Sequence, residues 1–409
     1  MSAIKEFRGL RPKKDLAHRI AELPYDVLSS EEARDIAKGN PYSFFHISKP
    51  EIDLPANINL YDDSVYETGK KNFGSFIQEG YLQQDEQPKL YLYSQVMQGR
   101  QQNGLVACVC IDDYMNNNVR KHELTRKDKE LDRTRHIETL NAQTGPVFLF
   151  YKEDSFKKVL YEEALRIEPA YDFTAADGIR HILRVIDNTS LIDSFKKAFS
   201  RDTLYIADGH HRAASAATAG QNRRKANPSY IGSDEFNWFL AVIFPHNQLQ
   251  ILSYNKVVKD LYGLTKEAYL NKVTDIFTVK KTGMKSPPAL HQFSMFLDRE
   301  WYTLIPSFNI KDDPIESLDV QILQNMLLDP ILGIKDPRTD KRIDFIGGIR
   351  GTQELERLVV SGAYQVAFSM YPTTIEQLIA VADADKIMPP KSTWFEPKLR
   401  SGLVVHLLG

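Results

Sequence analysis

The segment around Asp208 combines residue types that bind anions. A short apolar run ends in Asp208-Gly209 and is followed by His210, His211 and Arg212. A strand that turns through a glycine into a helix points free backbone N–H groups beyond the sheet, where they bind anions. Asp208 is expected to cap the helix, Gly209 to let a ligand approach the backbone, and the three basic residues to donate to phosphate oxygens. A capped helix with solvated histidines is the structural alternative.

A second group of chemically active residues lies between positions 122 and 136. If this segment is helical, five basic side chains at spacings of four, three, four and three residues share one face: His122, Arg126, Lys129, Arg133 and His136. No carboxylate interrupts this stripe, and like charges at such spacings repel each other. The stripe therefore indicates acidic partners elsewhere in the fold or a polyanionic ligand such as nucleotide phosphates. A solvated helix face is the alternative.

Glu123 lies beside the start of this stripe and is the candidate general base. A carboxylate near cations stays ionised and can accept a proton from a hydroxyl group. Such a base must come within about 2.6 to 3.2 Å of the hydroxyl, directly or through one water, while the transferred phosphate rests on the 208–212 turn. We therefore expect the Glu123 segment and this turn to meet at one pocket.

The pattern along the chain indicates which elements position these residues. Strands are predicted at 90–96, 105–111 and 203–207, and helices at 62–79, 122–141 and 212–219. Gly145-Pro146 ends the helical pattern that starts at His122. Alternating strands and helices predict an α/β or α+β fold with a mixed sheet.

The chain length predicts two domains, since 409 residues exceed the usual size of one. A stretch rich in Asn, Pro and Gly from Gly220 to Ser233 is the expected linker. We therefore expect an N-terminal catalytic and nucleotide domain at 1–225 and a C-terminal α/β domain at 226–409.

The composition is that of an ordinary globular protein and argues against several classes of partner. Lys and Arg number 52 and Asp and Glu 54, giving a net charge of -2, which disfavours nucleic acid and anionic membranes. The longest aliphatic runs fall far below the roughly 18 residues that span a bilayer, and the N-terminus has no apolar signal core. Cys108 and Cys110 cannot form a disulfide framework. We expect a cytoplasmic protein with small-molecule partners and no membrane partner.

The chain resembles a bacterial and archaeal family known as domain of unknown function 1015. The resemblance rests on the His122 segment, on 207–212 and on three further motifs, Leu23-Pro24-Tyr25-Asp26-Val27, Asn40-Pro41-Tyr42-Ser43-Phe44 and Met388-Pro389-Pro390-Lys391-Ser392-Thr393-Trp394-Phe395. More distantly, His122-Glu123-x-Thr125 followed by Asp208-Gly209-His210-His211-Arg212 is similar to the motif pair of the ParB-like free-serine kinases of the ParB/sulfiredoxin superfamily. Those enzymes phosphorylate L-serine at the expense of a nucleotide.

This resemblance implies a ParB/sulfiredoxin-like core and roles for individual residues. Glu123 matches the base that takes the serine hydroxyl proton, and the catalytic nucleotide-phosphate and metal loop matches Asp208, His210, His211 and Arg212. The residues expected to bind the cofactor are Gly209, His122, Thr125, Arg126, Arg133 and His136. The implied cofactors are Mg²⁺ and ADP or ATP, and the substrate is serine or O-phosphoserine in either direction. The rival hypothesis is a ParB-like, nucleotide-switched binding protein without turnover.

The chain also departs from the patterns of these relatives. About 50 residues, Lys152 to Arg201, separate the two motif strands. Sulfiredoxins need a cysteine where His210 stands, so sulfinic-acid reduction does not fit. Partition proteins carry arginines where His210 and His211 stand, together with a downstream helix-turn-helix that we do not find.

Polar loops in the C-terminal half offer further candidate ligands. Five of their residues could bind phosphate: Lys391, Ser392, Thr393, Lys398 and Arg400. Asp336 and Asp340 could help to hold Mg²⁺, which prefers oxygen ligands.

Overall fold

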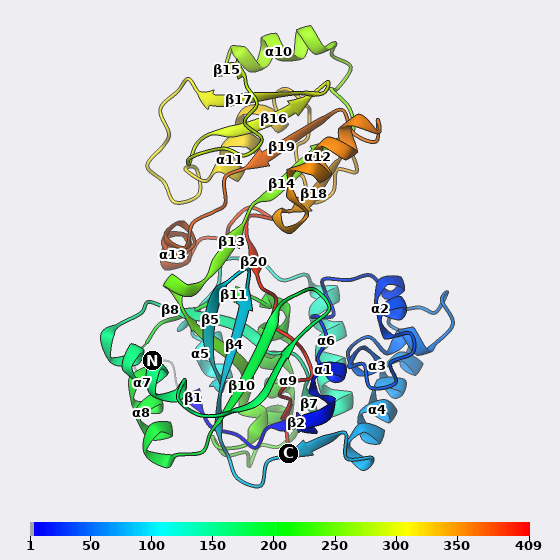
Figure 1. The fold of residues 1–409 in the computed structure, drawn as a ribbon, viewed down its shortest axis with the longest axis vertical. Coiled ribbons are helices and arrows are strands. Elements are labelled where there is room, and N and C mark those ends of the chain that lie inside the picture. Colours follow the sequence, from blue (N-terminus) through cyan, green and yellow to red (C-terminus); the bar gives the residue numbers. More distant parts are fainter. Residues whose placement is uncertain (1–3, 201) are drawn as a thin grey trace. The chain divides into compact units, whose positions relative to one another are not determined.

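The computed structural model describes residues 4–200 and 202–409, and the chain forms two compact units. The first unit contains Met1–Leu249 and Pro397–Gly409, and the second contains Gln250–Glu396 (Figure 1). This division differs from the boundary expected near residue 225. The strand β12 (Trp238–Pro245) pairs with two strands inside the sheet of the first unit, so the chain leaves that unit only after it.

A nine-stranded mixed sheet organises the first unit. Its order is β6-β11-β8-β12-β5-β4-β10-β9, and β1 also pairs with β5. The strand bounds are β1 Ile4–Lys5, β4 Leu90–Met97, β5 Arg100–Cys110, β6 Val119–Arg120, β8 Val147–Tyr151, β9 Pro169–Thr174, β10 Arg180–Ile186 and β11 Leu204–Asp208. The pairs β11–β6 and β12–β8 are parallel, and the other pairs are antiparallel. The predicted mixed α/β fold is confirmed.

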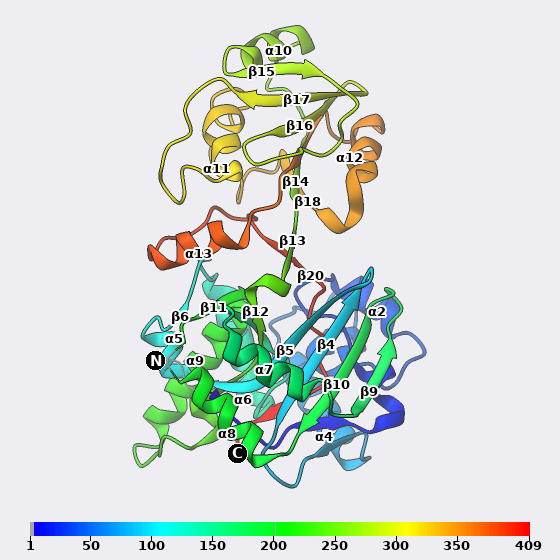
Figure 2. The same ribbon diagram turned by 60° about the vertical axis from the view of Figure 1, so that its left-hand side comes forward.

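The two faces of this sheet differ in what covers them. Alternate residues of β5 point to opposite faces, and Leu105, Ala107 and Val109 belong to a core with three helices. These helices are α7 (Ser155–Ala164), α8 (Thr189–Phe199) and α9 (His210–Ala226) (Figure 2). On β4, the Gln95 amide donates to the Lys398 carbonyl at 2.9 Å, and the Tyr93 hydroxyl accepts from the Arg400 backbone N–H at 3.4 Å. The C-terminal segment therefore meets the sheet at β4.

Helix α9 positions a second helix, α6 (Lys127–Leu140), beside the turn at its own start. Three side chains of α9 bind α6: Ser215 donates to the Glu130 carbonyl at 3.0 Å, Thr218 to the Glu130 carboxylate at 2.9 Å, and Asn222 to Glu138 at 2.9 Å. Five alanines of α9 are buried, and their small side chains allow close approach to neighbouring elements: Ala213, Ala214, Ala216, Ala217 and Ala219. Residues of α6 are thereby held next to those that begin α9.

The remaining elements of the first unit surround these layers. The helices are α1 Ala17–Ile20, α2 Ser30–Ala37, α3 Phe45–Ser48, α4 Asp63–Gln78 and α5 Ile111–Met115. Two short ribbons pair β2 (Leu10–Pro12) with β3 (Leu82–Gln84) and β7 (Ala142–Gln143) with β21 (His406–Leu407). The predicted helix at 62–79 and the predicted strand pair at 90–96 and 105–111 are confirmed.

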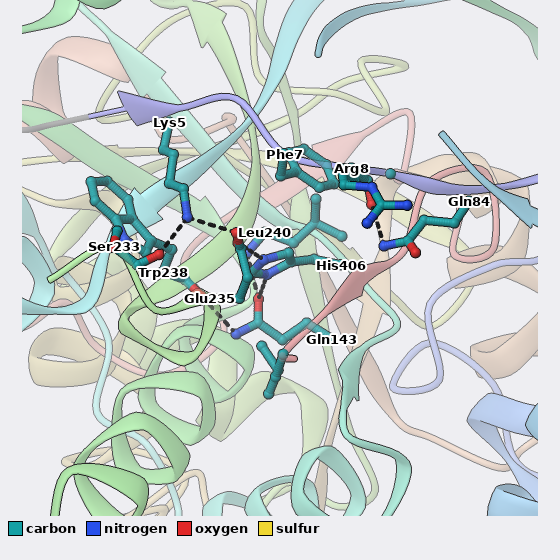
Figure 3. Close-up of polar contacts among 12 residues, drawn as sticks. Lys5, Phe7, Arg8, Gln84, Gln143, Ser233, Glu235, Trp238, Leu240 and His406 are labelled. Atoms are coloured by element: carbon teal, nitrogen blue, oxygen red, sulfur yellow. Dashed lines mark hydrogen bonds and ion pairs between the residues drawn. The ribbon is translucent and has the colours of Figure 1, made fainter. Parts of the chain in front are cut away.

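Buried polar contacts fasten the C-terminal segment to the first unit (Figure 3). His406 Nε2 lies 2.8 Å from a Glu235 carboxylate oxygen, and Lys5 Nζ donates to the other oxygen of Glu235 at 2.7 Å. The Gln143 side chain accepts from the Leu240 backbone N–H at 2.6 Å and donates to the Trp238 carbonyl at 3.1 Å. Lys5 and His406, near the two ends of the first unit's chain, thus share Glu235 as a partner just before β12.

The second unit is built on a six-stranded, fully antiparallel sheet with the order β15-β17-β16-β19-β14-β18. Its strands are β14 Tyr254–Val258, β15 Phe277–Lys281, β16 Phe293–Leu297, β17 Glu300–Pro306, β18 Ile343–Gly347 and β19 Val366–Met370. Its helices are α10 Lys266–Thr274, α11 Asp319–Leu323, α12 Gly351–Val360 and α13 Ile375–Asp383. Side chains of α10 and α11 share one core with the sheet, and those of α12 share another. A ribbon of β13 (Gln250–Leu252) and β20 (Trp394–Glu396) completes the unit.

Across residues 4–200 and 202–409, every helix is too short or too polar to cross a bilayer.

Candidate active site

The turn between β11 and α9 has the predicted strand, glycine and helix, but its acid has a different role. Gly209 is the N-cap residue with φ +92°, and among the described residues no side chain caps the first turn of α9. The prediction that Asp208 caps the helix is wrong, because its carboxylate accepts from Arg212 at 3.0 Å and lies 3.7 Å from Lys398 Nζ. Burial would raise the pKa of Asp208, but Lys398 and Arg212 lower it below its ordinary value. The Asp208 carboxylate is therefore an ion-pair partner and not the cap of α9.

Arg212 is the centre of a buried charge cluster. Its guanidinium donates to the Pro146 carbonyl and to Asp208, and lies 3.8 Å from the Asp26 carboxylate. Burial opposes its charge, but Asp26 and Asp208 hold the pKa of Arg212 above its ordinary value. Within the described residues, its buried Nε has no hydrogen-bond partner. One donor of a fixed, charged guanidinium therefore remains for a ligand.

The segment that carries Glu123 meets this turn, as predicted. The backbone N–H of His122 donates to His210 Nε2 at 3.4 Å, and that of Arg126 donates to His211 Nε2 at 3.0 Å. The rings of His122 and His210 meet edge to face at 4.5 Å. The half-exposed Glu123 carboxylate lies 3.8 Å from His210 Nδ1. The carboxylate and the start of α9 therefore border the same space.

The two histidines of the turn, predicted as donors to phosphate oxygens, each accept a backbone hydrogen bond at Nε2. Because each Nε2 accepts a backbone N–H, each neutral ring carries its proton on Nδ1. Burial lowers the pKa of His210 well below its ordinary value and lowers that of His211. His210 Nδ1–H faces Glu123, so it can orient that carboxylate.

The basic stripe is only partly a helix face. Helix α6 begins at Lys127, so His122 and Arg126 precede it. Arg126 is exposed and donates to Asp128 at 2.7 Å, and Lys129 donates to the Tyr61 hydroxyl at 3.3 Å. The helical prediction for 122–126 is wrong, because backbone hydrogen bonds to His210 and His211 hold this segment outside the helix.

Arg133 and His136, the last two residues of the stripe, lie beside Arg212. A pocket of about 480 Å³ is lined by residues that include Tyr25, Ser48, Arg133, His136, Thr144 and Arg212. The Arg133 guanidinium lies 4.2 Å from the centroid of the Tyr25 ring and donates to Asp132 at 2.9 Å. His136 Nε2 lies 2.9 Å from the Ile47 carbonyl, and burial lowers the pKa of His136 to about 4. The pocket thus presents two fixed arginines and one neutral histidine.

The other predicted ligands have mixed placements. The Thr125 hydroxyl donates to Glu130 at 3.2 Å, beside the start of α6. The place of a Cβ on Gly209 would lie 3.0 Å from Arg212 Nε, so this glycine lets the guanidinium fold against the turn. Asp336 and Asp340 each pair at 2.9 Å with an arginine two residues further along, Arg338 and Arg342. These two acids are surface ion-pair partners.

The sequence did not predict the place of three residues near the turn: Tyr25, Asp26 and Lys398. Asp26 and Tyr25 belong to a motif of the family resemblance, but the residue types alone gave them no chemistry. Lys398 was grouped with Lys391, although Lys398 lies in the first unit beside Asp208 and Lys391 lies in the second. The sequence does not show that these lysines belong to different units, because this depends on the return of the C-terminal segment to the first unit.

The described residues contain no cluster of three or more His, Cys, Asp or Glu side chains that could hold a metal ion by themselves. Mg²⁺ at nucleotide sites uses one or two carboxylates and completes its shell with phosphate oxygens and water. Two carboxylates of the site, those of Asp26 and Asp208, both face Arg212.

The fold and the site define a mixed α/β protein in which a carboxylate lies near the start of helix α9. The chain belongs to the family described as "Protein of unknown function (DUF1015)", whose model matches residues 4–321. No curated protein matches it in sequence.

Solved structures give distant similarities. A free serine kinase in complex with AMP is 10% identical with a TM-score of 0.35, covering 71% of this chain and 86% of that one. SbnI with a C-terminal truncation, from Staphylococcus aureus, is 11% identical with a TM-score of 0.36, covering 71% and 82%. A conserved hypothetical protein from Pyrococcus furiosus is 11% identical with a TM-score of 0.34, covering 74% and 95%.

Proposed function

We propose that the protein is a phosphotransferase that moves a phosphoryl group between an adenine nucleotide and the hydroxyl group of serine. The observation that carries this proposal is the approach of Glu123 to the start of α9, where its carboxylate lies 3.8 Å from His210. Phosphoryl transfer depends on positioning and charge neutralisation more than on covalent catalysis. The motif resemblance to free-serine kinases supplies the choice of serine and adenine nucleotide.

Each part of the site has a place in this reaction. The uncapped N-terminus of α9 and the free Nε of Arg212 bind phosphate oxygens. Arg133 adds a second fixed positive charge in the adjoining pocket. His210 is a positioning residue, because its Nδ1–H faces Glu123 while its Nε2 is held by the His122 backbone.

In the kinase direction, the Glu123 carboxylate takes the proton from the serine hydroxyl, and the serine oxygen attacks the γ-phosphorus of ATP. The bond from the γ-phosphorus to the bridging oxygen breaks, which gives O-phosphoserine and ADP, and Glu123 then returns its proton to water. By microscopic reversibility, the same groups transfer the phosphoryl group from O-phosphoserine to ADP. Mg²⁺ held by Asp208 and Asp26 would neutralise charge on the nucleotide phosphates.

The test follows the phosphate in both directions. The purified full chain is incubated with Mg²⁺ and either ATP plus one of several hydroxyl amino acids or ADP plus one of several phosphoamino acids, and products are read by ³¹P NMR. We expect transfer with serine and with O-phosphoserine. Nucleotide binding without transfer to or from any of these compounds would replace the enzyme hypothesis with the nucleotide-switch hypothesis.

A further inference from the structure

A second pocket lies wholly inside the second unit, where the phosphotransferase proposal assigns no residue. Residues that line it include Tyr254, Lys256, Asp319, Met370, Lys391 and Ser392. They come from β14, from the first residue of α11, from the end of β19 and from the loop before β20. Lys391 and Ser392 belong to one of the polar motifs noted in the sequence.

Lys256 is the most unusual group in this pocket. It lies in β14, between β18 and β19, and only 2% of the residue is exposed. In the described part of the chain, its ammonium makes no hydrogen bond or ion pair within 4 Å, and its Nζ lies 5.9 Å from the centroid of the Phe345 ring. Burial lowers the pKa of Lys256 to about 8, against the opposing effect of Asp319. Burial of an ammonium group without a counter-ion costs folding free energy. Because Lys256 lines this pocket, an anion bound in the pocket would supply the counter-ion.

The carboxylate of Asp319 pairs with His291 and not with Lys256 in the described part of the chain. Its carboxylate accepts from the His291 backbone N–H at 3.0 Å and lies 2.9 Å from His291 Nδ1. Lys391 brings a second ammonium to the pocket, 5.5 Å from the centroid of the Tyr254 ring. Two ammonium groups against one carboxylate leave an excess of one positive charge.

The walls of the pocket are mixed, with polar and apolar side chains. Leu290, Val320, Met370 and Pro372 add apolar surface beside the two lysines. A single negative charge would balance the excess, whereas a phosphate dianion would exceed it. We propose that this pocket binds a small organic acid, whose carboxylate pairs with Lys256 and whose carbon skeleton lies against Val320 and Met370.

The test observes Lys256 directly in the full chain. The protein is produced with lysine labelled with ¹³C at Cε, the Lys256 signal is assigned by its loss in Lys256→Met, and acetate, propionate or inorganic phosphate is titrated without nucleotide. We expect both carboxylates to move the Lys256 signal to saturation, with propionate binding more tightly than acetate because it buries an extra methylene. The signal of Lys259, an exposed lysine just after β14, should not follow this curve and serves as the internal control.

Two further outcomes decide the proposal. Lys391→Met should raise the dissociation constant of propionate about tenfold, because one of the two positive charges is lost; this variant keeps Lys256 and remains informative if Lys256→Met does not fold. A Lys256 signal that no anion moves, or that only phosphate moves, would overturn the organic-acid site. Neither result depends on phosphoryl transfer. The organic-acid site can therefore be disproved while the proposed phosphotransferase function stands, and the phosphotransferase function can be disproved while the organic-acid site stands.

Discussion

Arg212 shows how a buried charge is prepared for a ligand. Its partners Asp208 and Asp26 fix the guanidinium before any phosphate arrives, and such prior orientation is what electrostatic catalysis requires. Lysine would not replace it well, because a point charge cannot reproduce the planar fork.

Replacement of Arg212 by alanine should weaken both nucleotide binding and the fold. The change removes the guanidinium that holds Asp208 and leaves two carboxylates near one remaining cation, Lys398. Breaking a buried ion pair costs about 3 kcal/mol of unfolding free energy. Urea unfolding and nucleotide titration of Arg212→Ala measure the two effects, and Arg338→Ala, which removes an exposed arginine paired with Asp336, is the control. Unchanged stability and binding would contradict the role of Arg212.

His136 should make the stability of the protein depend on pH. Its folded pKa is about 4 against an ordinary value of 6.5, so the unfolded chain binds a proton first as pH falls. Stability is therefore complete above about pH 6.5 and is lost as pH falls toward 4, with about 2 kcal/mol lost from this residue between pH 7 and pH 5.

The matching variant is His136→Gln, which can still donate to the Ile47 carbonyl but does not titrate. Urea unfolding at pH 7 and pH 5 should show a drop about 2 kcal/mol smaller in this variant than in the parent. Equal drops would mean that His136 is not held neutral in the fold.

The resemblance to the motif pair of the free-serine kinases was sufficient to pair Glu123 with the 208–212 turn, but the sequence did not assign protonation states. The neutral state of His210 depends on a backbone N–H donated from a residue 88 positions earlier in the chain. The role of Asp208 as an ion-pair partner depends likewise on Lys398. No local pattern encodes either contact.

At the scale of elements, the strand and helix around the turn were predicted and the start of α6 was not. The spacing of basic residues continues back to His122, but the helix starts only at Lys127. The backbone N–H groups of His122 and Arg126 donate to the side chains of the first two residues of α9 and not to a helix of their own. Periodicity alone cannot detect such competition between local and tertiary hydrogen bonds.

Gly209→Ala should disturb the turn through both its backbone and its neighbour. At φ +92° a side chain is strained, by about 1 to 2 kcal/mol, and the new Cβ would lie 3.0 Å from Arg212 Cζ. The matched control is Gly178→Ala, which has φ +80° but no atom within 4 Å of the new Cβ. We expect similar strain in both variants in thermal unfolding, but weaker nucleotide binding only in Gly209→Ala. Equal binding by the two would show that the space beside Arg212 is not needed.

At the scale of the whole molecule, the sequence predicted two units but not their boundaries. The linker at 220–233 looked like a domain boundary, yet β12 follows it inside the first sheet. The return of Pro397–Gly409 to the first unit could not be foreseen, because it depends on contacts such as those of His406 and Val405.

Val405→Ala should therefore destabilise the first unit alone. Val405 is fully buried among residues of the first unit, and loss of its two methyl groups costs about 2 kcal/mol. Hydrogen exchange resolved by peptide should quicken in strands of the first unit and stay unchanged across 250–396. Val366→Ala, at a fully buried position of the second unit, should give the reverse pattern. Faster exchange in 250–396 from Val405→Ala would contradict the assignment of the C-terminal segment.

The most direct test of the phosphotransferase account compares two glutamate variants in the assay with serine and O-phosphoserine. Glu123→Gln keeps the shape of the side chain but removes the base, so turnover should fall by about 10² to 10⁴ while nucleotide affinity stays within about twofold of the parent. Glu138→Gln changes a carboxylate of α6 that bonds Asn222, and should turn over like the parent. If Glu123→Gln transferred phosphate as fast as the parent, the carboxylate would not be the base and the proposed mechanism would be wrong.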